Sequence, residues 1–212
     1  DHRIGILNKV GLPFVVHGRA TQIDEVYSWA DVNNASSFQR ATEFLLDLGH
    51  TRIALINGIE EMDFAQRRRA GYVEALKSRG IMPDPALMRS SEMTEVYGHH
   101  ETREMLNMEN PPTAILSSSL ITAIGIRRAI EEMGLKMGRD ISVITHDDDL
   151  SYLRNGQDVP IFTATRSSVR EAGRIIARML IDQIRNPDGA PKSQLLEAEL
   201  VVGRSTGPAP KK

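Results

Sequence analysis

Apolar residues recur along the chain with two different periods, and the two patterns alternate. Within 36–48 apolar residues return at spacings of three and four, which predicts a helix that Gly49 ends. The run 53–56 is short, wholly apolar and bounded by polar residues, as in a strand buried on both faces. A second helix is expected over 64–79. Residues 31–71 therefore predict one turn of a doubly wound α/β sheet.

The alternation of helix and strand continues through most of the chain. Ser168 and Glu171 form a capping-box pattern before one helix, and Asn33 or Asn34 is placed to cap the helix that begins near 36. Strands that alternate with helices favour a mainly parallel sheet with right-handed crossovers. Further strands are expected near 13–16, 114–116, 141–144, 160–165 and 196–202, and further helices over 98–108, 123–133 and 169–180.

Ligands of such sheets bind in the loops at the carboxyl ends of the strands. In this sequence those loops are 17–19, 60–68, 117–119 and 146–149. They carry charges of both signs and several hydroxyl groups, which suits a polyhydroxylated or zwitterionic small molecule.

The composition narrows the class of protein. With 212 residues, 41% of them hydrophobic, the chain can form one large domain or two small ones. Its net charge of -2 does not indicate a nucleic-acid surface, so any DNA contact is expected outside these residues. The absence of cysteine excludes disulfides and thiolate sites and is typical of a reducing compartment. No apolar run approaches the roughly 20 residues that span a bilayer, and Asp1-His2-Arg3 does not open a signal peptide.

Three consecutive arginines, Arg67 to Arg69, lie near the start of the helix predicted over 64–79. A guanidinium offers a planar fork of donors that pairs two neighbouring hydroxyls or a carboxylate, so Arg68 is a candidate ligand anchor. Consecutive helix positions cannot all face one cleft, so at most one or two of them face it. The alternative is that all three lie on a solvated helix face.

Three acids, Asp147 to Asp149, follow His146 at a strand end. An ionised carboxylate accepts two hydroxyl hydrogen bonds, so Asp147 could hold a sugar ring and form a clamp of opposite charge with Arg68. The same acid could instead cap a helix or satisfy a turn. A Mg²⁺ site is a third possibility, because hard cations bind carboxylate oxygens, but the sequence has no phosphate loop.

Hydroxyls, an aromatic and two histidines are weaker candidates. Ser118 and Ser119 lie between a strand and a helix, where hydroxyls most often cap the helix, and no nucleophile elbow surrounds Ser119. Phe64 is either a core residue or an aromatic face against sugar C–H groups. His99 and His100 are neighbours on a predicted helix and point apart, so they make a poor metal pair.

Seven short segments occur in a characteristic order. They are P-F-V-V-H-G-R, D-V-N-N, L-G-H-T-R-I-A-L-I-N-G, R-R-A-G-Y-V-E-A-L, P-P-T-A-I-L, G-R-D-I-S-V-I-T-H-D-D and V-P-I-F-T-A-T-R. Each is weak alone, but in this order and spacing they resemble the effector-binding domain of the LacI/GalR family of bacterial transcription regulators. The resemblance covers the chain from Asp1 to about Thr206.

The resemblance implies an α/β fold of two subdomains like that of periplasmic sugar-binding proteins, each a doubly wound parallel sheet flanked by helices. It assigns 1–48 and 164–184 to a DNA-proximal subdomain and 49–161 and 196–203 to a distal one, with 204–212 as a flexible tail. It also implies an N-terminal helix-turn-helix headpiece and a hinge helix, which we expect to lie outside this sequence. The first strands of the proximal subdomain are expected to be missing as well.

The same resemblance implies which residues contact the effector. The family's ligand-binding arginine corresponds to Arg68 and its ligand-binding acid to Asp147. The sequence departs from the family's pattern at Ser119-Leu120, where the family has N-D, and at His146, where it has tyrosine. The further positions that match cleft-lining sites are Ser119, Phe64, Thr94 and Val32.

The function implied by the resemblance is that of a sugar-responsive, homodimeric transcription regulator of the repressor type, working in the cytoplasm. The chain would be its effector-binding and dimerisation core, reaching operator DNA through the headpiece, with no membrane, metal or cofactor. Closure around the ligand would move the DNA-binding heads. Two alternatives are a periplasmic sugar-binding protein of a transporter and a Mg²⁺-dependent phosphoryl-transfer enzyme that uses Asp147 to Asp149.

Overall fold

The structure is a computed structural model that describes residues 2–21, 23–150 and 152–211. Its helices are α1 (His2–Val10), α2 (Asn34–Asp47), α3 (Asp63–Ser78), α4 (Glu95–Leu106), α5 (Leu120–Glu132) and α6 (Val169–Arg185). Its strands are β1 (Val15–His17), β2 (Ser28–Val32), β3 (Ile53–Asn57), β4 (Met88–Ser90), β5 (Ala114–Ser117), β6 (Ser142–Asp147), β7 (Thr163–Arg166), β8 (Ser193–Leu196) and β9 (Glu199–Val201).

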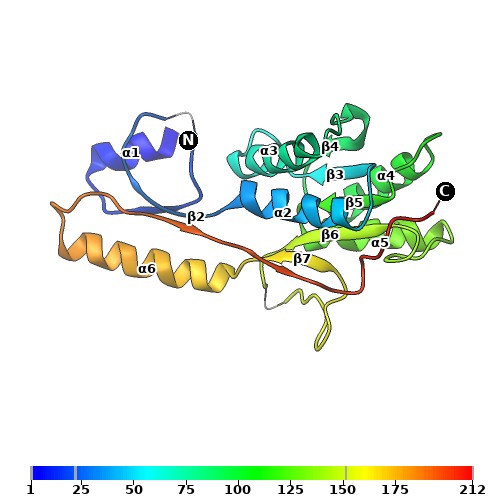
Figure 1. The fold of residues 1–212 in the computed structure, drawn as a ribbon. Helices are drawn as coiled ribbons and strands as arrows, with labels where there is room; N and C mark the ends of the chain where they lie inside the picture. The colour runs from blue at the N-terminus through cyan, green and yellow to red at the C-terminus, as the bar shows by residue number, and fades with distance from the viewer. Residues whose placement is uncertain (1, 22, 151, 212) are drawn as a thin grey trace.

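The described strands form two separate sheets, which lie side by side along the length of the molecule (Figure 1). The smaller sheet has the order β1-β2-β8, and both of its pairings are parallel. Helix α6 packs on β1 and β2, and Figure 1 shows α1 on the opposite side of this sheet. We call these elements the first unit.

The larger sheet has the order β4-β3-β5-β6-β7-β9 and is parallel except for β9. Helices α2 and α3 cover one face of it, where Phe38, Leu45 and Tyr72 are fully buried. Helices α4 and α5 cover the other face with side chains such as Met105 and Ile126. Because both faces are covered, β3, β5 and β6 are buried along their whole length. The predicted α/β fold with parallel sheets flanked by helices is confirmed, and we call this part the second unit.

Glycines allow the paired helices of the second unit to touch backbone to backbone. A Cβ on Gly71 of α3 would lie 2.1 Å from the carbonyl oxygen of Ala35 in α2. A Cβ on Gly125 of α5 would lie 1.9 Å from the carbonyl oxygen of Glu95 in α4. Both positions therefore exclude any larger residue unless the helices move apart.

Within the described residues the chain crosses between the two units three times, at 32–34, 166–169 and 196–199. These crossings differ from the subdomain boundaries expected from the resemblance. Helix α2 packs on α3, and β7 pairs with β6, so both lie in the second unit. Strand β8 pairs with β2 and lies in the first unit. The apolar face of a helix predicts that this face is buried, but it does not predict which of the two sheets the helix packs on.

The end of the chain is packed against the second unit, so the expectation of a flexible tail over 204–212 is wrong for most of it. Ser205 is fully buried, and its backbone oxygen accepts from the amide of Val143 at 2.8 Å. The amide of Ala209 donates to the carbonyl of Leu48 at 2.9 Å. Lys212, like Asp1 at the other end, lies outside the described residues. No helix in the described part of the chain is long and apolar enough to cross a membrane.

Candidate functional site

Arg68 lies on the inward face of α3 and is only 6% exposed. Its Nε donates to Asn34 Oδ1 at 2.7 Å, and its Nη1 donates to the carbonyl oxygen of Ser118 at 2.6 Å. The guanidinium also lies 5.0 Å from the ring centroid of Phe38 and 4.9 Å from that of Phe64. Two hydrogen bonds and two aromatic faces thus hold the fork in one orientation.

The charge of Arg68 survives this burial. Desolvation lowers the pKa of the guanidinium from its ordinary range to about 10, and the negative charges of Asp148 and Asp31 oppose that shift. The group therefore stays protonated at neutral pH. Because Nη2 has no hydrogen-bond partner among the described residues, it can donate to a ligand.

The three consecutive arginines point in different directions, as predicted from their helix positions. Arg69 is exposed and pairs with Glu60 at 2.6 Å. Arg67 is half-buried, and its Nη2 donates to the carbonyl oxygen of Arg19 at 3.1 Å. Of the three, only Arg68 enters the interior of the second unit.

Asp31, at the end of β2, joins the first unit to α3. Its Oδ2 lies 2.9 Å from Arg19 Nε and 3.4 Å from Arg67 Nη1, and the carboxylate is almost fully buried. The guanidinium of Arg19 stacks on Trp29 at 4.9 Å. A second link runs from the amide of Thr21 to Asp63 Oδ1 at 3.0 Å. The loop after β1 and the start of α3 are therefore held together across the boundary between the two units.

The three acids at the end of β6, Asp147 to Asp149, have three different partners. Asp147 is buried, and its Oδ1 accepts from the amide of Asp149 at 2.9 Å. Asp148 lies 3.2 Å from Nε2 of His146, whereas Asp149 pairs with Arg166 at 2.6 Å. The carboxylates thus do not converge on a point where Mg²⁺ could bind. Within the described ranges no group of three or more histidine or acid side chains is placed to hold a metal ion.

His146, in β6, is buried. Its Nδ1 lies 2.9 Å from Thr165 Oγ1, and its Nε2 is 3.2 Å from Asp148 Oδ1. Burial, and then the charge of Arg68, lowers the pKa of His146 below its usual 6.5, so the ring is neutral. Nε2 also lies 3.2 Å from Ser167 Oγ. The tautomer with its proton on Nε2 suits both oxygens near that atom, Asp148 Oδ1 and Ser167 Oγ, and leaves Nδ1 to accept from Thr165.

The clamp expected between Arg68 and Asp147 stays a prediction. The acids whose negative charges oppose the fall in the pKa of Arg68 are Asp148 and Asp31. Asp147 lines a small cavity of about 150 Å³ together with Asp148 and Ser119. The other residues of that cavity are apolar: Met93, Leu120, Ile121, Leu150 and Leu153.

The other predicted site residues have local structural roles. Ser119 caps α5 through the amide of Thr122, and Thr94 caps α4 in the same way. Val32 is buried at the end of β2, and its carbonyl accepts from Asn34. The structure therefore brings Arg68 together with Phe64 and Asp147 together with Ser119, while Thr94 contacts neither pair in any described hydrogen bond.

Several residues around Arg68 were not singled out from the sequence. Asn34 was considered only as a helix cap, but Asn33 caps α2 and Asn34 faces Arg68. Asn57 accepts from Ser118 Oγ at 2.6 Å, which fixes the loop whose carbonyl binds Arg68. The signal that could have indicated Asn34 is the pair of consecutive asparagines after β2. Only one of the two can cap the helix, so the other is available for a different contact. Nothing in the pattern distinguished Phe38 from an ordinary core residue.

Comparisons with known proteins identify the family. The periplasmic binding protein-like domain family matches residues 42–206. A crystal structure of a regulatory protein of the LacI family from Chloroflexus aggregans is 30% identical, has a TM-score of 0.85, and matches over 98% of this chain and 73% of that one. The chain belongs to the LacI family. Its fold is therefore that of an effector-binding domain in this family.

Two other members of the LacI family illustrate its range. The HTH-type transcriptional regulator AglR of Rhizobium meliloti is 46% identical over 99% of this chain and 59% of AglR. A structure of the transcriptional regulator CelR with cellobiose is 29% identical, has a TM-score of 0.87, and matches over 97% of this chain and 62% of that one. The chain thus spans about six tenths of the length of AglR. These relatives are transcriptional regulators, which favours regulation over transport or phosphoryl transfer.

Proposed function

We propose that this chain is the effector-binding core of a sugar-responsive transcriptional repressor that works in the cytoplasm and is not an enzyme. The observation that carries the proposal is the buried, charged Arg68 fork, whose Nη2 has no partner among the described residues. A charged donor held in one orientation suits the hydroxyls of a sugar ring. The cellobiose bound by CelR supports a carbohydrate as the ligand class.

Six residues are proposed as effector contacts. Arg68 donates to ring hydroxyls, Asp147 accepts from them, and Phe64 packs its ring face against the Arg68 guanidinium. Ser119, Thr94 and Val32 border the cleft and limit the size of the ligand. To this set we add Asp148, whose charge reaches Arg68.

The proposed mechanism couples ligand binding to the angle between the two units. A ligand that contacts Arg68 and the acids 147–149 binds more tightly to one arrangement of the two units than to the other. This difference in affinity shifts the equilibrium between the two arrangements. AglR is named an HTH-type transcriptional regulator, and on that basis we propose that this chain acts on operator DNA through a helix-turn-helix headpiece.

Homodimerisation is proposed on the basis of an exposed apolar face of α5. Ile121 and Ile124 are 40% and 41% exposed, and they lie one turn apart on the same side of the helix. Tyr152, on the loop after β6, is 79% exposed. Large apolar side chains gathered on one helix face are typical of an interface. Sedimentation of Ile124→Asp against the natural protein would test this assignment.

The test of the function uses the intact protein, a panel of neutral mono- and disaccharides that includes cellobiose, and the DNA upstream of its own gene. We expect one class of sugar to raise the melting temperature, since ligand at a hundred times its Kd stabilises by about 2.7 kcal/mol. The same sugar should release the protein from DNA in a mobility-shift assay. A sugar that binds without changing DNA affinity would contradict the regulatory role, and a complete lack of sugar binding would contradict the ligand class.

A further inference from the structure

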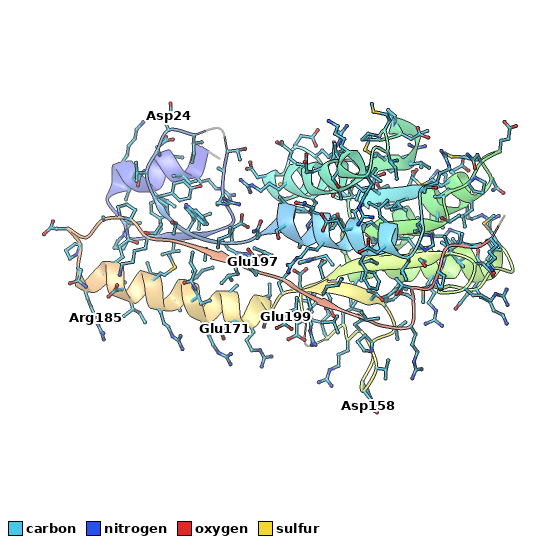
Figure 2. The ribbon with its side chains drawn as sticks, viewed as in Figure 1. Asp24, Asp158, Glu171, Arg185, Glu197 and Glu199 are labelled. Carbon is cyan, nitrogen blue, oxygen red and sulfur yellow. The ribbon has the colours of Figure 1, made fainter. Side chains whose placement is uncertain are left out.

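Two of the three crossings between the units are bonded to each other. The amide of Asn33, in the crossing 32–34, donates to the carbonyl oxygen of Leu196 at 2.8 Å. The side-chain Nδ2 of Asn33 donates to Oε1 of Glu197, in the crossing 196–199, at 2.6 Å. Figure 2 shows Glu197 on the segment that runs from the first unit to the second. Asn33 therefore holds the neighbouring crossing through both its backbone and its side chain.

Arg40 of α2 binds the same crossing from the side of the second unit. Its Nη2 donates to the backbone carbonyl oxygen of Ala198, a residue that is only 1% exposed, and lies 3.6 Å from Oε2 of Glu197. Each oxygen of the Glu197 carboxylate thus has a different partner, Asn33 in one crossing and Arg40 on α2. We call Asn33, Arg40 and Glu197 the crossing lock.

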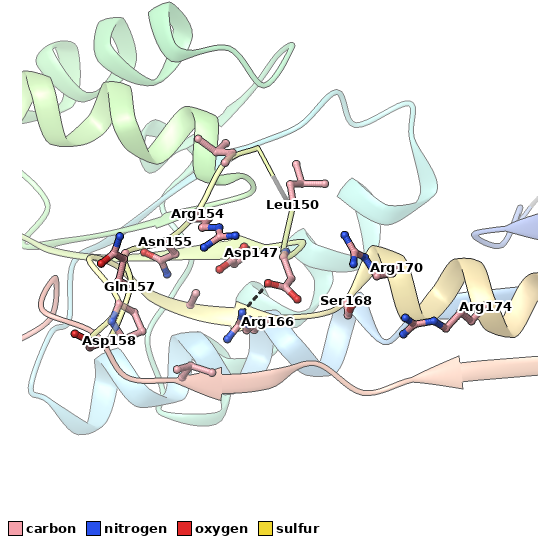
Figure 3. Close-up of a pocket in the computed structure, with 16 residues that line it drawn as sticks. Asp147, Leu150, Arg154, Asn155, Gln157, Asp158, Arg166, Ser168, Arg170 and Arg174 are labelled. Atoms are coloured by element: carbon pink, nitrogen blue, oxygen red, sulfur yellow. Dashed lines mark hydrogen bonds and ion pairs between the residues drawn. The ribbon is translucent and has the colours of Figure 1, made fainter.

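The third crossing, 166–169, is bonded to a different part of the second unit. The amide of Ser167 donates to the carbonyl oxygen of Asp147 at 2.9 Å. Arg166 pairs with Asp149 at 2.6 Å, the contact that the dashed line in Figure 3 marks. None of the described residues of this crossing bonds to the crossing lock. The third crossing is therefore attached to the acids of the candidate site, whereas the other two are attached to each other.

The contacts of the crossing lock depend on the angle between the units. A rotation of the first unit twists each crossing, and a hydrogen bond weakens steeply when its donor and acceptor lose their alignment. The lock is thus satisfied in the arrangement described and weakened in others. Two arrangements that exchange differ little in free energy, so charge-assisted contacts made in only one of them change their populations several-fold.

We propose that Asn33, Arg40 and Glu197 set the resting angle between the two units. A ligand that contacts the acids 147–149 acts on the third crossing, and the crossing lock opposes the rotation at the other two. The lock itself does not depend on which ligand binds. Its effect on operator affinity rests on the proposed function, because the angle then determines how a DNA-binding headpiece is held.

The angle can be measured directly because the chain contains no cysteine. Arg178 in α6 and Glu104 in α4 are exposed and belong to different units. The Arg178→Cys/Glu104→Cys variant therefore carries one spin label on each unit. Pulsed electron paramagnetic resonance of the intact protein without ligand gives the distribution of distances between the two labels. Dilution into unlabelled protein keeps each measured pair within one copy of the chain.

In this background Glu197→Ala should shift or broaden the distance distribution, because the carboxylate between Asn33 and Arg40 is lost. Glu199→Ala is the matched control and should leave the distribution unchanged. Glu199 is exposed two residues further along (Figure 2), and its side chain has no hydrogen bond or ion pair with any residue that the structure describes. Arg40→Ala should act like Glu197→Ala, and the two changes combined should give less than the sum of their effects, since both break one lock.

Operator affinity is the second readout. Glu197→Ala should change the affinity of the intact protein for the DNA upstream of its gene by about threefold or more, and Glu199→Ala should not change it. The affinity for a sugar found in the melting screen should change in the opposite direction, because the sugar and the operator favour different arrangements. A loss of stability alone would lower both affinities.

An unchanged distance distribution in Glu197→Ala would overturn the crossing lock, and so would an equal shift in Glu199→Ala. A shifted distribution with unchanged operator affinity would support the lock and contradict the proposed function instead.

Discussion

Arg67 of α3 and Asp31 of β2 form an ion pair across the boundary between the two units, with 3.4 Å between Nη1 and Oδ2. Asp31 is the shared acceptor for Arg67 and Arg19, and it is the more buried member of each pair. Its charge therefore holds a segment of the first unit against the helix that carries Arg68.

Asp31→Asn should lower the free energy of unfolding by about 1–3 kcal/mol, because both arginines lose their charged partner in a partly buried setting. The value is below that of a fully buried pair, since the side chain of Arg19 is 28% exposed. Urea unfolding measures it. The control is Asp47→Asn, whose ion pair with Arg79 is exposed on both sides and should cost less than about 1 kcal/mol. Equal losses in the two variants would show that the Asp31 cluster does not hold the units together.

Arg68→Lys should weaken binding of the effector sugar by about tenfold or more and lower stability by about 1–3 kcal/mol. An ammonium keeps the charge but cannot bond Asn34 and Ser118 simultaneously in the planar geometry of the fork. Calorimetry with the sugar found in the melting screen and urea unfolding report the two effects. Arg69→Lys, at an exposed position in the same helix, should change neither. Natural affinity in Arg68→Lys would exclude Arg68 from the effector site.

His146 should make stability depend on pH. Its pKa in the folded protein is lowered, first by burial and then by Arg68, so below about pH 6.5 the unfolded chain binds a proton that the folded protein does not. The stabilisation is therefore present above that pH and is lost as the pH falls, at up to about 1.4 kcal/mol per pH unit. Burial lowers the pKa of His50 as well, which adds a loss of the same sign.

Urea titrations at pH 7.5 and 5.5 measure this dependence. His146→Gln should reduce the difference in unfolding free energy between the two pH values, whereas His100→Gln, at an exposed position, should leave it unchanged. A difference equally large in His146→Gln and in the natural protein would show that His146 is protonated in the folded state too.

Two glycines in helices should respond in opposite directions to alanine. Gly125→Ala places a Cβ where the carbonyl of Glu95 lies 1.9 Å away, so we expect a loss of about 1–3 kcal/mol from overpacking. Gly173→Ala in α6 meets no atom within 4 Å and should gain about 0.5–1 kcal/mol from helix propensity. Thermal unfolding of both variants gives the sign directly. A stabilised Gly125→Ala would mean that α4 and α5 do not pack as closely as described.

Most of the second unit could be predicted from the sequence because its helices have clear apolar faces. The helix expected over 36–48 is α2 (Asn34–Asp47), and the one expected over 64–79 is α3 (Asp63–Ser78). Ser168 caps α6 as the capping-box pattern predicts. The first unit was harder to predict. Helix α1 was missed, since its weakly amphipathic sequence carries little helical signal, and the strand expected over 196–202 proved to be β8 and β9, one in each sheet.

The sequence predicted which loops form the candidate site, but not which side chains contact one another within it. Parallel topology places the ends of β3, β5 and β6 together, so Arg68, Ser119 and Asp147 were expected near one another. The positions of the three acids depend on the path of the backbone after Asp147, where Asp149 has a left-handed φ of 55°. That path is not encoded in periodicity or composition. The contacts of all these residues with a ligand remain predictions.

The three crossings at 32–34, 166–169 and 196–199 have a mechanical consequence. Two bodies joined by one tether can swing in any direction, but three short tethers at separate points remove most of those freedoms. The units can then open and close mainly about a single axis, along which all three segments twist together. A ligand bound between the units would consequently affect the rest of the protein through one variable, the angle between the two units.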